Sequence, residues 1–366
     1  MRVGLNALHL VPGETGGSEV YARRLVPALL EAEPTLRLTV FVGREAAGER
    51  WPDSVDVVRL PVNARSRWGR VLAEQTLLPA AVVRAPPDLL HNLFTTAPAL
   101  PTVPQVTTIH DLIYKRFPQT HAGLLTYGMR VLVPLAARRS RRVIAVSEAT
   151  KADVVSFLGV PAARVDVTYE GPGMPEVKPV PEAELRRTLE LGDAPIVLTV
   201  SAKRPHKNLE RLLDAFARVD GDAILVAPGY ETPFEAQLRR RAEGSAERVR
   251  FVGWVEDSVL EGLYRAATCL AFPSLAEGFG LPVLEAMLRG VPVACSSSTS
   301  LPEIAGNAAL YFDPLDVTAI ADAIERLLHD EELRTRLRRA GFEQARRFSW
   351  EATATHTIRT YEAALA

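Results

Sequence analysis

Cysteine and long apolar runs are scarce in this sequence of 366 residues. The two cysteines, Cys269 and Cys295, stand far apart, each within an apolar stretch. Their number and spacing exclude a cysteine zinc cluster or a disulfide framework and are typical of a reducing cytosol; we expect both as small core residues. No stretch approaches the ~20 apolar residues of a membrane-spanning helix. The N-terminus lacks the basic flank, apolar run and cleavage site of a signal peptide. A cytoplasmic protein is therefore predicted.

Charge of one sign is also missing, since the net charge is −1. No basic run is interleaved with aromatic residues, so a nucleic-acid partner is not expected. The charge is unevenly divided, because residues 1–172 carry 20 Lys and Arg against 15 Asp and Glu, and residues 173–366 carry 23 against 29. The densest basic cluster comprises Arg138, Arg139, Arg141 and Arg142. It is either a solvated helix end or a patch that meets an anionic acceptor or a membrane surface peripherally.

Short β-branched apolar runs alternate with amphipathic helical patterns along the chain, which predicts βα units and parallel sheets. In the first half, strands are expected at Val3–Leu8, Leu36–Val42, Val55–Leu60, Leu89–Leu93, Gln105–His110, Arg142–Val146 and Val165–Tyr169. Helices are expected between them at Ser18–Glu31, Val71–Arg84, Leu124–Arg139 and Glu148–Leu158. In the second half, strands are expected at Ile196–Ala202, Ala223–Ala227, Val249–Val252, Thr268–Phe272 and Val291–Ala294, with helices at Asn208–Val219 and Asp257–Ala266.

One segment interrupts this alternation. Residues 171–181 contain four prolines and two glycines, a composition that cannot donate regular ladder hydrogen bonds and indicates a linker. We therefore predict two α/β doubly wound, Rossmann-like domains, over residues 1–172 and 173–348. A helical pattern at Glu331–Arg347 is followed, after a short break, by a last helix over residues 349–366 that Ser349 caps.

Ligands of open α/β sheets bind beyond the carboxyl ends of the strands, so unusual residues after each strand are candidates for a site. The strongest candidate is the segment Glu277-Gly-Phe-Gly-Leu-Pro-Val-Leu-Glu285. Pro282 stands where a helix would take its first turn, and the helix dipole would favour anions there. The two flanking carboxylates suit a polyhydroxylated ligand. An ordinary helix start has the same pattern, so spacing alone leaves both interpretations open. The amides expected to face the ligand are those of Gly278, Phe279, Gly280 and Leu281.

A basic loop follows the strand predicted at Ile196–Ala202. Lys203, Arg204 and Lys207 crowd the start of a helix, where positive charge opposes the helix dipole. Such a placement predicts a bound polyanion such as a diphosphate; random clustering of surface cations is the alternative.

Two further sets of candidate site residues follow strands in the first half of the chain. Gly16 and Gly17 precede the first long helix, for which Ser18 is the expected N-cap, and would let the backbone approach a phosphate. A plain loop glycine pair is the alternative. His110 ends another strand, where it is a polar contact, a general base or a core residue.

No metal site is predicted. Asp220-Gly-Asp222 matches a D-x-D pattern, but it lies between a helix and the start of a strand, at the wrong edge of the sheet for a ligand. We interpret it as a turn. The histidines show no ligand spacing with one another.

Taken together, these residues resemble the retaining glycosyltransferases of family 4, which have the GT-B fold of two Rossmann-like domains facing each other across a cleft. The resemblance covers nearly the whole chain, in family order. It is carried by Glu277-x7-Glu285 followed by Gly290-Val-Pro-Val, and by Gly16-Gly17, Thr108-Ile-His-Asp-Leu, Val146-Ser-Glu, Lys207-Asn208, Phe251-Val-Gly-Trp254 and Leu301-Pro-Glu-Ile-Ala-Gly306.

The resemblance implies a role for each candidate residue. Glu285 would bind the ribose hydroxyls of a nucleotide-diphosphate sugar, and Glu277 with the amides of the segment would hold the transferred sugar. Lys207 would meet the diphosphate, helped by the amides of the glycine pair. His110 would contact the sugar near its reacting carbon. The backbone around Trp254 and Val255 would lie against the base.

The reaction implied is transfer of a hexosyl group with retention of configuration, without a metal or other cofactor. The nucleotide sugar would be the co-substrate, and a carbohydrate or lipid-linked saccharide would be the acceptor, bound by the first domain. The family's terminal helix crosses back to that domain. The run Trp68–Leu78, with Glu74-Gln75, resembles the mannosyl- and rhamnosyl-transferring subgroup and favours GDP-mannose.

The sequence departs from the family pattern in two places. Ala202 stands where many members have an arginine, so Lys203 or Arg204 would supply the second phosphate cation. Glu170 stands where members often have asparagine, and the sequence offers no account of it. Three alternatives stay open: an epimerase or phosphorylase on the same fold, a non-catalytic nucleotide-sugar-binding protein, and an inverting transferase with His110 as general base.

Overall fold

The computed structural model describes residues 1–118 and 124–366. Contacts within the chain divide it into two compact units. The first unit comprises Met1–Gly173 together with Phe348–Ala366, and the second comprises Met174–Arg347. The chain passes from one unit to the other twice, after Gly173 and after Arg347.

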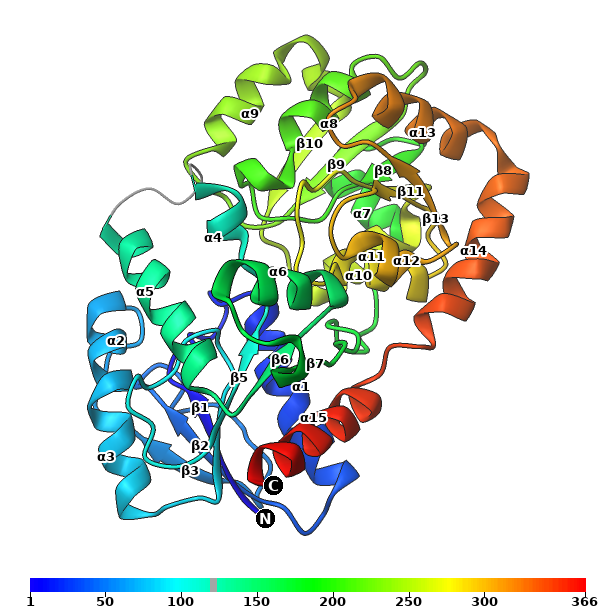
Figure 1. Ribbon diagram of the computed structural model, residues 1–366. Coiled ribbons are helices and arrows are strands. Elements are labelled where there is room, and N and C mark those ends of the chain that lie inside the picture. The colour runs from blue at the N-terminus through cyan, green and yellow to red at the C-terminus, as the bar shows by residue number, and fades with distance from the viewer. Residues whose placement is uncertain (119–123) are drawn as a thin grey trace. The chain divides into compact units, whose positions relative to one another are not determined.

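The first unit is a parallel sheet of seven strands, in the order β3-β2-β1-β4-β5-β6-β7, with helices between them (Figure 1). Its strands are β1 (Arg2–Ala7), β2 (Arg37–Val42), β3 (Asp56–Arg59), β4 (Leu89–Asn92), β5 (Gln105–Ile109), β6 (Arg142–Ala145) and β7 (Val165–Val167). Its helices are α1 (Gly17–Ala32), α2 (Arg67–Gln75), α3 (Leu77–Arg84), α4 (Ile113–Arg116), α5 (Leu124–Arg139), α6 (Glu148–Leu158), the 3-10 turn η2 (Ala162–Arg164) and α15 (Trp350–Leu365).

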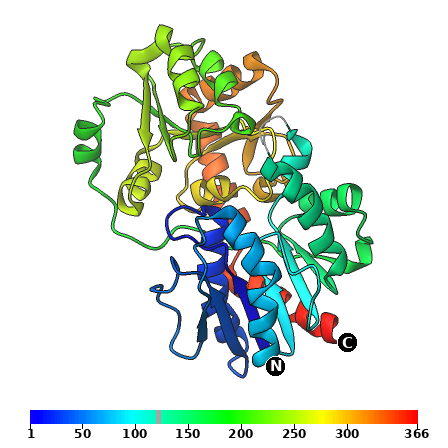
Figure 2. The same cartoon turned by 90° about the vertical axis from the view of Figure 1, so that its left-hand side faces the viewer.

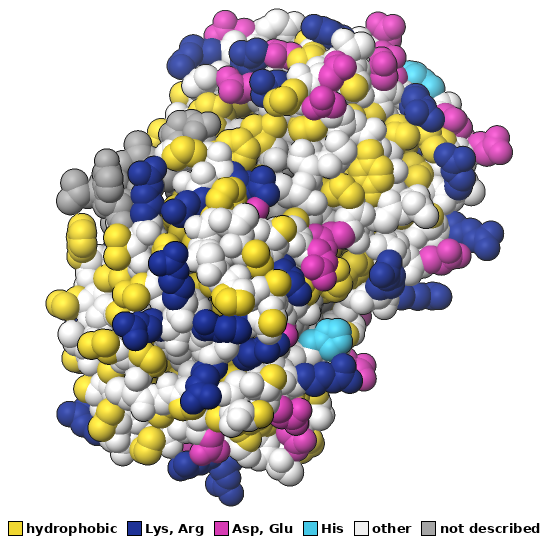
Figure 3. Space-filling model, in the orientation of Figure 1, with side chains coloured by type: hydrophobic (Ala, Val, Ile, Leu, Met, Phe, Trp, Pro, Cys, Tyr) yellow, Lys and Arg dark blue, Asp and Glu magenta, His cyan; other side chains and the backbone are white. Residues whose placement is uncertain are grey.

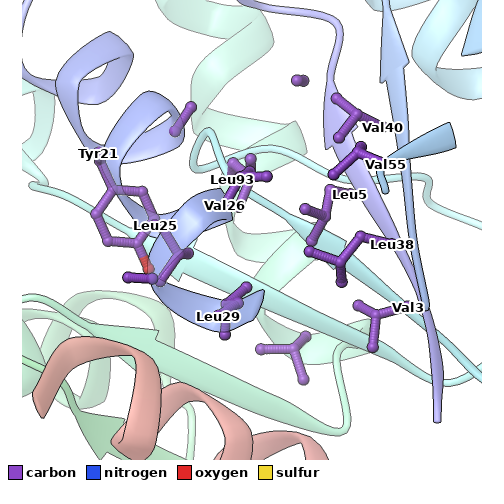
Figure 4. Close-up of a cluster of buried hydrophobic side chains, with 14 of the residues drawn as sticks. Val3, Leu5, Tyr21, Leu25, Val26, Leu29, Leu38, Val40, Val55 and Leu93 are labelled. Atoms are coloured by element: carbon purple, nitrogen blue, oxygen red, sulfur yellow. The ribbon is translucent and has the colours of Figure 1, made fainter. Parts of the chain in front are cut away.

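Side chains of successive strand residues point to opposite faces, and both faces of this sheet are covered. On one face, Val3 and Leu5 of β1 pack with Leu25 and Leu29 of α1 in a fully buried cluster (Figure 4). Figure 2 shows α2 and α3 (light blue) over the other face. There Phe41 and Leu90 of the strands pack with residues of these two helices, namely Ala73, Leu78 and Val82.

Helix α15 belongs to the first unit although it ends the chain, and it lies beside α1 (Figure 1). Its N-cap is Ser349, whose hydroxyl accepts from the Ala352 amide at 3.1 Å. The Trp350 indole donates to the Pro172 carbonyl at 2.7 Å. The Tyr361 hydroxyl lies 2.7 Å from Nδ1 of the buried His91 on β4. The last two hydrogen bonds hold α15 on the first unit, and its residues Ala354, Tyr361 and Ala364 belong to the same hydrophobic cluster as Val3 and Leu5 of β1.

The second unit is a parallel sheet of six strands, in the order β10-β9-β8-β11-β12-β13. Its strands are β8 (Ile196–Leu198), β9 (Ile224–Pro228), β10 (Val249–Gly253), β11 (Cys269–Phe272), β12 (Val293–Ser296) and β13 (Ala309–Phe312). Its helices are α7 (Glu182–Thr188), α8 (Leu209–Phe216), α9 (Glu235–Arg241), α10 (Asp257–Ala266), α11 (Leu281–Leu288), α12 (Leu301–Ala305), α13 (Val317–His329), α14 (Glu331–Ala345) and the 3-10 turns η3 (Pro205–Lys207) and η4 (Glu243–Arg248). Both cysteines are buried as expected, and burial raises the pKa of the Cys269 thiol to about 12.

The structure corrects several expected elements. The helix predicted over Val71–Arg84 is two helices that meet at Thr76, because Pro79 has no N–H for the carbonyl of residue 75 and crowds it. Strand β12 begins two residues later than predicted, since Pro292 cannot donate to the ladder. Strand β8 is shorter than predicted, and β13 was missed. Among the helices of the two described ranges, none is long and apolar enough to cross a membrane.

A buried polar network lies at the carboxyl ends of β1 and β4. The Glu74 side chain on α2 is fully buried, and its Oε1 accepts from Asn6 Nδ2 and Thr96 Oγ1, each at 3.0 Å. The His9 ring lies 3.6 Å from the same oxygen. Within the described residues, Glu74 Oε2 is buried without a hydrogen-bond partner. Burial raises the pKa of Glu74 to about 7, although the hydrogen bonds from Thr96 and Asn6 and the charge of Arg70 oppose the rise.

This raised pKa predicts that the Glu74 side chain makes stability depend on pH. The folded protein holds the proton up to about pH 7, whereas the unfolded chain releases it near 4.5. The stabilisation is present below pH 4.5 and is lost as pH rises through 7, amounting to about 3 kcal/mol. Glu74→Gln mimics the protonated form and should remove this loss, so that the variant is more stable than wild type at pH 8. Urea unfolding of both proteins at pH 5 and pH 8 measures the difference. Equal pH dependence in the two proteins would contradict the assignment.

Candidate active site

The segment Glu277–Glu285 leads from β11 into α11, as the sequence predicted. Gly280 immediately precedes the helix with φ of 116°, a conformation that favours glycine. A Cβ there would lie 2.8 Å from Leu301 Cδ2. Pro282 stands in the first turn, and among the described residues no side chain caps this helix end. The glycine therefore lets the backbone turn sharply at the start of α11.

Two residues that sequence reasoning missed hold this loop in place. Thr299 Oγ1 accepts from the Glu277 amide at 2.9 Å. Ser300 Oγ donates to the carbonyls of Glu277 and Phe279, at 3.1 and 2.7 Å. Both follow β12, the neighbour of β11, and Thr299 has φ of 52°. The run of serine and threonine from 296 to 300 after a strand was the available signal.

Lys207 lies beside Glu277 because their strands are neighbours. Strands β8 and β11 pair in parallel, so that the loops after them meet at one edge of the sheet. The His206 carbonyl accepts from the Leu275 amide at 2.8 Å and ties the two loops together. Lys207 Nζ then lies 2.7 and 2.9 Å from the two carboxylate oxygens of Glu277. The predicted phosphate cation and the predicted sugar-binding carboxylate are thus in direct contact.

Lys203 and Arg204 are the two candidates for a second phosphate cation, and Lys203 is engaged in contacts inside the second unit. Its side chain is fully buried. Its ammonium donates to the carbonyls of Ala227, Gly229 and Ser201, at 2.7, 3.1 and 3.4 Å. Burial lowers the pKa of Lys203 to about 8. The ammonium of Lys203 is thus directed into the fold, whereas Arg204, the other expected phosphate cation, is exposed.

Glu285 lies on α11, one helix turn before Arg289, and is 4% exposed. Its Oε1 accepts from the Met174 amide at 2.8 Å, and its Oε2 pairs with the Arg289 guanidinium. Arg289 also contacts Glu261 at 2.6 Å. The carboxylate is therefore held in one orientation by a partly buried cation, a feature that the Glu-x3-Arg spacing could have suggested.

The remaining predicted residue pair of the second unit follows β10. Gly253, at the end of this strand, has φ of 71°. Trp254 comes next and is 58% exposed, whereas Val255 is half-buried. They lie at the carboxyl edge of the sheet, as do Lys207 and Glu277. Asp220 and Asp222 lie before β9, at the opposite edge, as predicted.

In the first unit, Gly16 is the N-cap of α1 and has φ of 62°. The prediction that Ser18 caps this helix is wrong, because the turn already begins at Gly17. Gly16 and Gly17 are both exposed, and nothing lies within 4 Å of a Cβ placed on Gly16. The first-turn acid Glu19 bonds to the Gly13 amide at 2.9 Å. The backbone at this helix start is therefore open to a ligand.

Glu170, which the sequence left unexplained, is the partner of His110. Its carboxylate Oε1 lies 3.1 Å from His110 Nδ1, and the Leu93 carbonyl lies 2.9 Å from Nε2. A carbonyl only accepts, so Nε2 donates, and an ionised Glu170 requires Nδ1 to donate as well. Burial disfavours the cation, but the Glu170 bond and charge, the Leu93 carbonyl and Asp111 outweigh it and raise the pKa of His110. Both hydrogen bonds and the raised pKa favour the protonated ring.

This pairing predicts that Glu170→Gln lowers the pKa of His110. The variant keeps the size of the side chain but loses the negative charge, which leaves burial as the dominant influence. NMR titration of the histidine ring protons in wild type and variant measures the shift. Glu176→Gln, an exposed change in the linker, is the control. An unchanged His110 titration would show that Glu170 does not hold the proton.

Both units therefore place charged and polar side chains at the carboxyl edges of parallel sheets. The second unit offers a cation, two oriented carboxylates and a glycine-shaped helix start, which suit an anionic, polyhydroxylated ligand. Such a fold and site are typical of a two-domain α/β enzyme that binds an anionic, hydroxyl-rich ligand. Among the residues described, no group of three or more His, Cys, Asp or Glu side chains is placed to hold a metal ion.

Comparisons with known proteins agree with this class. Residues 15–171 match the family described as Glycosyltransferase Family 4, and residues 181–344 match Glycosyl transferases group 1. The O-antigen chain mannosyltransferase B of Escherichia coli is 34% identical over 268 residues, which are 70% of this chain and 70% of that protein. The serotype-specific mannosyltransferase WbdA of Escherichia coli is 28% identical over 310 residues, which are 78% of this chain but 38% of that protein. The chain belongs to glycosyltransferase family 4.

Solved structures confirm the fold. A sucrose-phosphate synthase from Thermosynechococcus elongatus has a TM-score of 0.80 at 23% identity, covering 99% of this chain and 98% of that one. WaaG, a glycosyltransferase involved in lipopolysaccharide biosynthesis, has a TM-score of 0.75 at 17% identity, covering 97% and 98%. The two Rossmann-like units are those of the GT-B glycosyltransferases.

Proposed function

We propose that this glycosyltransferase moves a mannosyl group from GDP-mannose to a hydroxyl of a saccharide acceptor, with retention of anomeric configuration and without a metal. The second unit binds the donor. The observation that carries the proposal is the Lys207–Glu277 contact beside the glycine turn into α11, with Glu285 oriented on the same helix. The mannosyl group is favoured because the relatives named above are mannosyltransferases.

In the proposed reaction, the bond from the anomeric carbon to the diphosphate oxygen breaks as the acceptor oxygen bonds to that carbon on the same face. The acceptor proton passes to the departing diphosphate. Lys207, with Arg204, offsets the negative charge that develops on the leaving group. Glu277 accepts hydrogen bonds from hydroxyls of the sugar. An inverting reaction with His110 as base is disfavoured, because both ring nitrogens donate hydrogen bonds.

The acceptor is proposed to be a carbohydrate or lipid-linked saccharide bound by the first unit. On the face of that unit seen in Figure 3, Lys and Arg side chains (dark blue) lie among hydrophobic ones (yellow). Arg138, Arg139 and Arg141 are exposed, whereas Arg142 pairs with Asp166. A basic surface of this kind favours peripheral association of the protein with the anionic, cytoplasmic face of a membrane.

The test has three parts: the identity of the donor, the anomeric configuration of the product and the dependence of the rate on a metal. Thermal shifts with GDP-mannose, UDP-glucose and their nucleotides identify the donor, because a ligand stabilises in proportion to its binding. The α-linked donor should yield an α-linked product by NMR, and EDTA should leave the rate unchanged. A β-linked product would overturn retention, and a requirement for Mg²⁺ or Mn²⁺ would overturn the metal-free mechanism. Donor binding with no transfer to any saccharide would indicate a binding protein.

A further inference from the structure

A second set of polar residues at the carboxyl edge of the first sheet has no role in the proposed donor chemistry. It comprises His9, directly after β1, Thr96, after β4, and Glu74 on α2. Thr96 Oγ1 lies 3.1 Å from His9 Nε2 and 3.0 Å from Glu74 Oε1. The His9 side chain is 15% exposed, while Thr96 is 7% and Glu74 0% exposed. The histidine ring is therefore the part of this network that a ligand can reach.

The hydrogen bonds determine which nitrogen of His9 carries the proton. Thr96 has one hydroxyl proton, and it donates that proton to Glu74. Its oxygen must then accept from His9, so Nε2 carries the ring proton. Burial, and next the charge of Arg70, lower the pKa of His9 well below 6.5, so the ring is neutral. A neutral ring protonated at Nε2 has its lone pair on Nδ1, which accepts hydrogen bonds.

The backbone that carries Thr96 is strained. Thr95 has φ of 48°, a left-handed conformation that a β-branched residue rarely adopts. The residues on either side both contact His9: the Phe94 ring stacks on it with centroids 5.8 Å apart, and Thr96 bonds to Nε2. Strain of this kind is concentrated at functional sites.

The network also adjoins the predicted reaction site. Leu93, next to Phe94, accepts the hydrogen bond from His110 Nε2. The Leu93 amide donates to the carbonyl of Asn6, whose side chain donates to Glu74. His9 and His110 thus both contact one short segment at the end of β4, over residues 93–96.

We propose that Nδ1 of His9 accepts a hydrogen bond from a hydroxyl of the saccharide acceptor, and that Thr96 and Glu74 are positioning residues that fix the ring and its proton. The proposal rests on the proposed glycosyl transfer and names a residue through which the first unit binds the acceptor. His9 orients the hydroxyl; the acceptor proton still leaves with the diphosphate.

Three variants of His9 separate the two ring nitrogens. His9→Phe keeps the stacking on Phe94 but removes both nitrogens. His9→Gln places an amide near Nε2, and His9→Asn places one near Nδ1. We expect the acceptor KM to rise about tenfold in the Phe and Gln variants and less in the Asn variant, as loss of one hydrogen bond implies. The donor KM should stay unchanged in all three, and His356→Asn, an exposed change on α15, is the control.

The positioning role has its own test. Thr96→Val removes the oxygen that receives the His9 proton, whereas Thr96→Ser keeps it. The acceptor KM should rise in the Val variant and return to the wild-type value in the Ser variant, with kcat for hydrolysis of the donor by water unchanged in both. A merely structural threonine would alter the donor KM and hydrolysis as well.

The outcomes distinguish the two proposals. If the wild-type protein transfers no sugar, the proposed function fails. If it transfers sugar and His9→Phe keeps the wild-type acceptor KM, the function stands and the assignment of His9 is overturned. Equal acceptor KM in the Asn and Gln variants would overturn the choice of Nδ1. His9→Phe must unfold at the wild-type temperature; if it does not, the contrast between the Asn and Gln variants decides.

Discussion

Lys207→Ala is expected to lower kcat by a factor of about 10²–10³, as the loss of one group that stabilises developing charge does in other enzymes. The diphosphate gains further negative charge as the glycosidic bond breaks, so the ammonium stabilises the transition state more than the bound donor. The substitution also leaves the Glu277 carboxylate, 10% exposed, without its cation. Repulsion between this carboxylate and the anionic donor should raise the donor KM. Steady-state kinetics with varied donor separates the two effects.

A matched control for this variant is Lys178→Ala, which removes an exposed lysine from the same unit. Its kinetics should equal those of the wild type. The double variant Lys207→Ala, Glu277→Gln tests the contact itself, because it should recover part of the donor KM but none of kcat. If Lys207→Ala turns over the donor within twofold of wild type, the diphosphate is not bound at this loop.

Glu285→Ala is expected to weaken donor binding about 10- to 100-fold, because a hydrogen bond to a charged group contributes about 1.5–3 kcal/mol. The carboxylate has about four lone-pair sites, and the Met174 amide and Arg289 approach it from within the unit. Two adjacent hydroxyls of a ribose can donate to the same group. Calorimetric titration with GDP-mannose measures the change, and the affinity for mannose 1-phosphate, which has no ribose, should not change.

Glu261→Ala is the control for the structural part of this effect. Glu261 and Glu285 are both buried carboxylate partners of Arg289, so that each substitution leaves the guanidinium one partner. Both variants should therefore lose stability, but only Glu285→Ala should lose affinity for the donor. Equal affinities in the two variants would mean that Glu285 only holds α11 in place.

The fold, and the glycine turn from β11 into α11, could be predicted from the sequence because the signals are local. Period-2 and period-3.6 apolar patterns placed most strands and helices of two doubly wound units, and the proline-rich linker divided them. Gly280 and Pro282 mark a helix start whatever surrounds them. Thr76, where one predicted helix is two, and β13, which was missed, show that such patterns mark element ends poorly.

Other features depended on the tertiary structure, because they join residues that are distant along the chain. Lys203 and Lys207 have the same chemistry and lie four residues apart. Lys203 points into the core because it donates to the Ala227 carbonyl of the neighbouring strand. Lys207 instead contacts the Glu277 carboxylate, 70 residues away. Glu170 was an unexplained departure until β5 and the segment after β7 brought it to His110, 60 residues distant. The proton on His9 depends on Thr96, 87 residues away. Residue type and local pattern thus determined the elements and the class of enzyme. The hydrogen-bond partners and the proton positions of the candidate site residues depend on residues that are distant in sequence and become neighbours only in the folded chain.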